Sequence, residues 1–142
     1  MNSIHHEAVA LDTNVFIFAL RKATAYPACE ALLFDKLSEL QVYLPLQIFV
    51  ELQHNLTGDE MRGVLRALLR AKTVTWDYAP APAELITQWE QQGAKKGDAV
   101  IAAHLEAANI RYLVSENRHF LTEILTSPFQ VLRSAAVIEL LK

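Results

Sequence analysis

The 142-residue sequence contains only one cysteine, four glycines and five prolines. The lone cysteine, Cys29, cannot form an intrachain disulfide; such a residue is usually a small core hydrophobe and suits a reducing compartment. So few glycines and prolines, with 52% hydrophobic and 20% charged residues, exclude a low-complexity or disordered chain. No glycine-rich turn follows a strand-like segment, which excludes the Walker and dinucleotide-binding motifs. We therefore expect a fully folded chain without a disulfide.

The sequence also lacks an excess of positive charge and long apolar runs. The formal net charge is −3, so any nucleic acid would have to meet a local basic patch or a bound cation. No segment approaches the roughly 18–20 apolar residues of a membrane span, and the N-terminus has no apolar stretch long enough for a signal peptide. These absences favour a cytoplasmic protein that is not attached to a membrane.

The length predicts one domain, residues 1–142, which can bury about 70% of the surface of the unfolded chain. Five short apolar segments are strand-like: residues 7–11, 41–45, 73–77, 110–115 and 129–133. Seven segments have apolar residues three and four positions apart, as in helices: residues 14–22, 26–40, 45–56, 59–71, 80–92, 97–109 and 134–141. Because the two kinds alternate, we expect an α/β fold with a mainly parallel sheet and helices on both faces.

The stretch "VALDTNVFIFAL" interrupts two apolar runs with Asp12, Thr13 and Asn14. A predicted strand ends at Asp12, and a predicted helix begins directly after it. Ligands of open parallel sheets bind beyond the carboxyl ends of the strands, which makes Asp12 a candidate for a binding site. Capping of the following helix explains an aspartate at this position equally well.

Two other acids join Asp12 as candidates. Asp98 lies in the first turn of the predicted helix 97–109, where the helix dipole favours a carboxylate and capping alone is again sufficient. Glu51 lies beside the apolar face of the predicted helix 45–56, where a solvated edge is the simpler interpretation. If the sheet brings all three together, they repel one another and raise some of their pKa values unless a cation is present. Mg²⁺ or Mn²⁺ suits such oxygen ligands, activates water and neutralises charge on a phosphodiester.

These acids occur within a recognisable series of motifs. In order and spacing, "VALDTNVFI", Glu51, "KKGDAVIAAHL" and "YLVSENRHF" resemble a PIN domain of the kind found in the VapC-type ribonuclease toxins of toxin–antitoxin pairs. The resemblance extends from Val9 to about Val131. It implies a three-layer α/β/α sandwich, often dimeric, that acts as a metal-dependent endoribonuclease with Mg²⁺ or Mn²⁺. Its implied partners are single-stranded or structured RNA, an antitoxin protein and a second copy of the chain.

The resemblance also implies roles for individual residues. Three acids would bind the metal and take part in catalysis: Asp12, Glu51 and Asp98. Three polar side chains would position ligands and water: Thr13, Asn14 and Ser115. Basic residues next to the acids in sequence are candidates for contacts with RNA phosphates: Lys95, Lys96 and Arg118, and further His119, Arg21 and Lys22.

One position departs from the commoner pattern of the family. Many PIN domains have a fourth acid two residues after the Ser or Thr that ends the fourth strand, but this chain has Asn117 there, preceded by Glu116. An amide can ligate a metal or hydrogen-bond its water without adding charge, so we expect one firm metal site, with Asn117 as the fourth member of the catalytic set.

Two alternatives to an active ribonuclease are open at this stage. The first is a PIN-like module that binds RNA with weak or no catalysis, which the amide at position 117 favours. The second is a phosphatase of the haloacid dehalogenase type, which uses an aspartate at a strand end. That class needs a second acid two residues later, and Asn14 at this position counts against it.

Overall fold

The computed structural model describes residues 4–123 and 128–142, within which five parallel strands form one sheet. The strands are β1 (Ala8–Leu11), β2 (Gln41–Pro45), β3 (Thr73–Asp77), β4 (Tyr112–Val114) and β5 (Gln130–Leu132). Their order in the sheet is β3-β2-β1-β4-β5, and each neighbouring pair is parallel. The predicted parallel sheet is therefore confirmed, and each predicted strand contains an observed one.

Helices connect the strands, as the sequence predicts. The α-helices are α1 (Thr13–Leu20), α2 (Pro27–Ala31), α3 (Leu46–Asn55), α4 (Gly58–Leu68), α5 (Ala83–Gln91), α6 (Lys96–Ala107) and α7 (Ser134–Leu140). Two short turns continue α2, the π-helical η1 (Leu32–Lys36) and the 3₁₀-helical η2 (Leu37–Glu39). A further π-helical turn, η3 (His119–Glu123), follows β4.

The sequence-based prediction differs from the structure in three local features. The predicted helix 26–40 is divided into α2, η1 and η2, and the turn η3 was not predicted. Pro45 was expected in the first helical turn of α3, but it is the last residue of β2 and the N-cap of α3. Its ψ of 157° is extended, as the N-cap position requires, so the proline ends the strand and α3 begins one residue later.

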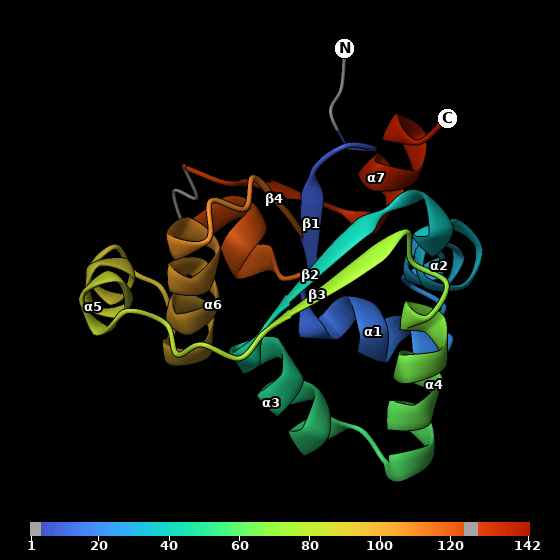
Figure 1. Cartoon of the computed structure of the whole chain (residues 1–142), viewed down its shortest axis with the longest axis horizontal. Coiled ribbons are helices and arrows are strands. Elements are labelled where there is room, and N and C mark those ends of the chain that lie inside the picture. Colours follow the sequence, from blue (N-terminus) through green and yellow to red (C-terminus); the bar gives the residue numbers. More distant parts are fainter. Residues whose placement is uncertain (1–3, 124–127) are drawn as a thin grey trace.

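The helices enclose the sheet on both sides, giving a three-layer α/β/α sandwich. In Figure 1, α5 and α6 lie on one side of the strands, while α1, α2 and α4 lie on the other. Contacts between elements agree with this arrangement, because α1 meets α2, α3 and α4, and α5 meets α6. The described residues contain no helix that is long and apolar enough to cross a membrane.

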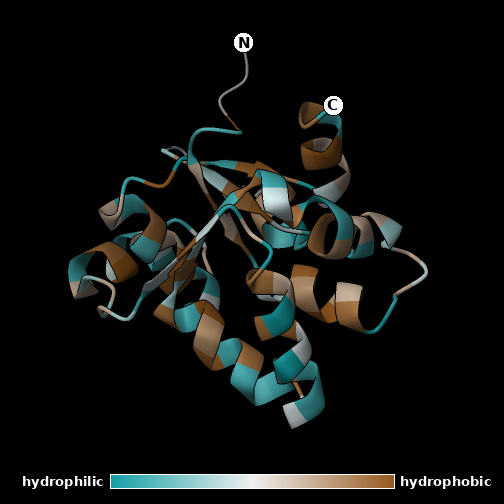
Figure 2. Ribbon diagram, turned by 45° about the vertical axis from the view of Figure 1, so that its right-hand side comes forward, coloured by the Kyte–Doolittle hydropathy of each residue, from teal (hydrophilic) through white to brown (hydrophobic). Residues whose placement is uncertain are grey.

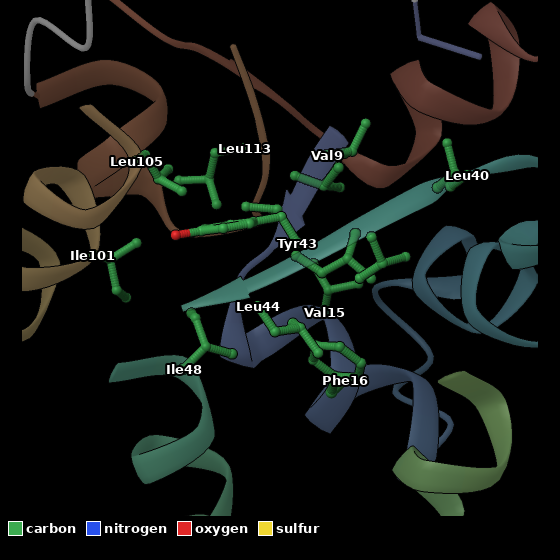
Figure 3. Close-up of a cluster of buried hydrophobic side chains, with 14 of the residues drawn as sticks. Val9, Val15, Phe16, Leu40, Tyr43, Leu44, Ile48, Ile101, Leu105 and Leu113 are labelled. Carbon is green, nitrogen blue, oxygen red and sulfur yellow. The ribbon is translucent and has the colours of Figure 1, made fainter. Parts of the chain in front are cut away.

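The core consists of two apolar layers, one on each face of the sheet. In Figure 2 hydrophobic and hydrophilic segments alternate along the helices around the strands, and the buried residues come from β2 and from helices on both sides of the sheet, for example Val42, Phe16 and Ile101. Neighbouring residues of β2 point in opposite directions: Tyr43 extends toward Ile101 and Leu105 of α6, and Leu44 lies near Phe16 of α1 (Figure 3). Both faces of the central strands β1 and β2 are covered, so their sequences are almost continuously apolar, whereas the edge strand β3 alternates and is only partly buried.

The parallel arrangement sends the carboxyl ends of the central strands to one edge of the sheet. There the backbone of Asp12 donates to the carbonyl oxygen of Val114 at 2.9 Å, and that of Ser115 donates to Leu132 at 3.0 Å. The residues that follow β1, β2 and β4 thus come together at this edge.

Candidate metal centre

Asp12 is the most buried acid of the site, with only 4% of its surface exposed. Its Oδ1 accepts a hydrogen bond from the backbone of Thr13 at 2.8 Å, and its Oδ2 accepts one from Ser115 Oγ at 2.7 Å. Burial raises the pKa of Asp12 from its usual 3.8 to about 6, the two hydrogen bonds oppose this shift, and the charges of Glu51 and Asp98 add to it. Desolvation, rather than the repulsion that the sequence suggested, is therefore the main cause.

Glu51 lies in the second turn of α3, partly buried beside Asp12. Its Oε1 accepts from Thr13 Oγ1 at 2.7 Å, and its Oε2 accepts from Gln47 Nε2 at 2.9 Å. The N-terminal turn of α6 passes close by, because a Cβ atom at Gly97 would lie only 3.0 Å from Glu51 Oε2. The absence of a side chain at Gly97 allows this close approach, so Glu51 belongs to the cluster and is not a solvated helix edge.

Asp98 lies in the first turn of α6 and is half-buried. Asn117 Nδ2 approaches its two carboxylate oxygens at 3.4 and 3.3 Å. The pKa of Asp98 is raised, mainly by burial and to a smaller extent by the charge of Glu51, whereas the hydrogen bond from Asn117 opposes the shift. Capping alone does not account for Asp98, because a side chain from the loop after β4 is directed at its carboxylate.

Asn117 is itself held in place by the loop that follows β4. Its backbone N–H donates to Ser115 Oγ at 2.9 Å, and its side-chain oxygen accepts from the backbone of His119 at 3.0 Å. Since Ser115 also donates to Asp12, a continuous series of hydrogen bonds runs from Asp12 through Ser115 and Asn117 to Asp98.

Glu116, the other candidate for the fourth position, faces away from Asp98. Its carboxylate is buried and accepts from the backbone of Ser134, at the start of α7, at 2.8 Å. Arg133 Nη1 lies 3.4 Å from Oε1 of Glu116, and Cys29 Sγ lies 3.9 Å from Oε2, the oxygen that accepts from Ser134. The structure therefore places Asn117, and not Glu116, beside the three acids.

The remaining predicted residues differ in their surroundings. Asn14 accepts a hydrogen bond from the backbone of Glu116 at 3.3 Å, so it holds the loop after β4. Lys95, Lys96 and Arg118 are exposed and adjacent in sequence to Asp98 or Asn117. Arg21 does not border the acids: it lies at the far end of α1 and pairs with Glu60 of α4 at 2.9 Å.

Two contributors to the site, Gln47 and Gly97, were not predicted from the sequence. Gln47 lies four residues before Glu51, a spacing at which helical side chains meet, and this was the available signal for its role. The role of Gly97 depends on how α6 approaches α3, which no local pattern reveals.

The donor set suits a hard divalent cation. Among the described residues, no three His, Cys, Asp or Glu side chains are grouped closely enough to enclose a metal by themselves. Mg²⁺ does not need such an enclosure, because it keeps several waters and commonly takes one or two carboxylates. Two observations fit this: all three acids are oxygen donors, and the pKa values of Asp12 and Asp98 are raised, so the charged carboxylates lack stabilisation without a cation. The residues fit Mg²⁺ or Mn²⁺ better than Zn²⁺.

Comparison with known proteins gives the family. The model of the PIN domain matches residues 9–122, which is most of the chain. The chain belongs to the PIN-domain family. PIN domains are generally nucleases and typically depend on divalent metals.

Two solved structures share the fold of this PIN domain. The first is the crystal structure of VapBC2 from Rickettsia felis bound to a DNA fragment from its promoter, with a TM-score of 0.60 and 22% sequence identity. The match covers 89% of this chain and 98% of the matched chain. The second is the crystal structure of PAE2754 from Pyrobaculum aerophilum, with a TM-score of 0.55 and 12% sequence identity. The match covers 99% of this chain and 100% of the matched chain. No sequence among curated proteins matches the chain. At these identities the two structures support the fold alone.

The buried charge of Asp12 predicts a specific pH dependence of stability. A raised pKa means that Asp12 holds its proton more firmly in the folded state than in the unfolded state. Protonation of Asp12 therefore stabilises the fold at low pH, and this stabilisation is lost as the pH rises through about 6. We therefore compare the free energy of unfolding of metal-free Asp12→Asn with that of metal-free wild type. The difference, variant minus wild type, should rise by about 2 kcal/mol from pH 4 to pH 7. Urea unfolding of both proteins in EDTA measures this difference. A difference that does not change with pH would contradict a raised pKa of Asp12 in the folded state.

Proposed function

We propose that this PIN domain is a metal-dependent endoribonuclease that hydrolyses phosphodiester bonds of RNA. The observation that carries the proposal is the convergence of Asp12, Glu51 and Asp98, with Asn117, at the carboxyl edge of the sheet. Each hydrogen bond described above for these carboxylates comes from a neutral donor, so none of these bonds pairs an acid with a cationic side chain in place of a metal ion. Membership of the PIN family also favours this function over the phosphatase alternative.

In this proposal, Asp12, Glu51 and Asp98 hold the cation. A cation held there would supply an activated water and would neutralise the charge that develops on the phosphodiester. Ser115 and the backbone of Thr13 fix the orientation of Asp12, and the Thr13 hydroxyl fixes Glu51. Exposed basic residues beside the acids would contact the RNA: Lys95 and Arg118 its phosphates, and Lys96 a phosphate or the base beside it.

The decisive variant is Asp98→Asn, which preserves size and removes one charge from the cation site. Cleavage of a single-stranded RNA by the purified protein with Mn²⁺ or Mg²⁺ should fall about a hundredfold or more, with the melting temperature unchanged or raised in the absence of metal. Asp59→Asn is a matched control, because Asp59 is exposed on α4, away from the acids. If wild type cleaves RNA and Asp98→Asn cleaves it equally fast, the site is assigned wrongly. If wild type binds RNA without cleaving it, the non-catalytic alternative is correct.

A second pair of variants tests the fourth position. Asn117→Asp adds a carboxylate about 3.3 Å from Asp98, so affinity for Mn²⁺ should rise about tenfold while the metal-free protein loses stability. Glu116→Gln should leave the affinity unchanged, because this side chain faces Ser134 and Arg133. Titration of Mn²⁺ into both variants measures the two affinities. A large loss in Glu116→Gln without a gain in Asn117→Asp would make Glu116 the ligand.

We further propose that the protein is a VapC-type toxin with an antitoxin partner, acting in the cytoplasm as a homodimer. The fold likeness to VapBC2 and the acid cluster support this proposal, since an antitoxin could present an arginine whose guanidinium replaces the cation between the carboxylates. Overexpression in the native host should slow growth, and Asp98→Asn should relieve the effect. Purification from that host should recover a second, basic chain. Normal growth together with recovery of the free chain alone would favour a stand-alone nuclease.

A further inference from the structure

A pocket lies beside the acid cluster, between α3, α5 and α6. Its volume is about 350 Å³, at the lower end of the range of roughly 300–1,000 Å³ that is typical of small-molecule sites. Six residues line it: Gln47, Ile86, Glu90, Lys96, Gly97 and Val100. The pocket can therefore take a group about as large as a nucleobase.

Two of the lining residues also contact the acid cluster. Gln47 donates its side-chain amide to Glu51 at 2.9 Å, and the backbone of Gly97 passes so close to Glu51 that a Cβ atom would lie 3.0 Å from Oε2. Asp98 is the next residue of α6. A molecule in the pocket would thus lie directly beside the carboxylates to which we assign phosphodiester chemistry.

The pocket combines apolar walls with two charges of opposite sign. Ile86 and Val100 are half-buried and offer aliphatic surface to a planar ring. Glu90 and Lys96 are exposed, and within residues 4–123 and 128–142 neither side chain makes a hydrogen bond or ion pair. A carboxylate and an ammonium group are therefore available to the same ligand.

Guanine is the base whose hydrogen-bonding edge fits this pair of charges. Its N1–H and N2–H₂ groups are adjacent donors that a carboxylate can accept together, and its O6 and N7 are acceptors that suit a lysine. Adenine and cytosine offer a single donor group beside an acceptor. Uracil offers one N–H between two carbonyl oxygens, so a carboxylate would face acceptors on both sides.

We propose that this pocket binds the guanine base of a nucleotide adjacent to the scissile phosphate, with Glu90 and Lys96 as the residues that set specificity. The proposal rests on the ribonuclease function above and names a preferred base for it. Bases of single-stranded RNA are commonly read by such contacts to their edges once they are splayed out of the stack.

The first experiment maps cleavage within an RNA of randomised sequence. Wild type should show a preference for guanine at one fixed position next to the cut. Glu90→Gln should reduce that preference by about five- to a hundredfold, the range expected for loss of one bidentate contact, without lowering total cleavage in proportion. Glu84→Gln is the matched control, because it makes the same change on the exposed part of α5 outside the pocket. Cleavage without any base preference, or a guanine preference that survives in Glu90→Gln, would overturn the assignment.

The second experiment does not depend on cleavage. Guanosine 5′-monophosphate should shift the methyl NMR signals of Ile86 and Val100, uridine 5′-monophosphate should shift them less, and Glu90→Gln should weaken the guanosine effect. Equal shifts with both nucleotides, or shifts confined to residues outside the pocket, would refute the base site. If the pocket binds the guanosine nucleotide but the protein cleaves no RNA, the proposed function fails while the binding site stands.

Discussion

The burial of one carboxylate, Asp12, at the end of the central strand is the constraint on which the rest of the site depends. Removing this group from water is unfavourable, and the shift of its pKa to about 6 expresses that cost. The fold offsets part of the cost with two short hydrogen bonds, one from the adjacent backbone and one from Ser115 across the sheet. Those donors fix the carboxylate in one orientation, and the loop after β4, which supplies Ser115, also supplies Asn117 beside Asp98.

Two acidic residues near this edge have opposite roles although both are buried. Asp12 is left with neutral donors and with the charges of Glu51 and Asp98 nearby, so its environment disfavours the ionised form. Glu116 accepts the first backbone N–H of α7 and has Arg133 within 3.4 Å, so its charge is already compensated inside the fold. The loop after β4 therefore separates an acid that stabilises the fold from a position, Asn117, that faces the candidate metal centre.

The sequence predicted the strands and the alternation of elements because each leaves a local signal, whereas the grouping of the three acids was predicted from the resemblance of their motifs to a PIN domain. Apolar segments of five or six residues identify the buried strands, and a polar residue that interrupts them indicates a strand end. The sequence could not predict that Asn14 holds the loop of Glu116, that Arg21 pairs with Glu60, or that Gly97 makes room for Glu51. Each of these depends on contacts between segments at least 39 positions apart, which only the assembled sheet creates.

The strand order also determines when the site can form during synthesis. β1 is the middle strand, and its second edge stays open until β4, residues Tyr112–Val114, has been made. Ser115 and Asn117, which hold Asp12 and Asp98, follow directly after it. An incomplete chain on the ribosome therefore contains the acids but not the groups that orient them. The last central strand to be made is thus also the one whose following loop completes the orientation of the acids.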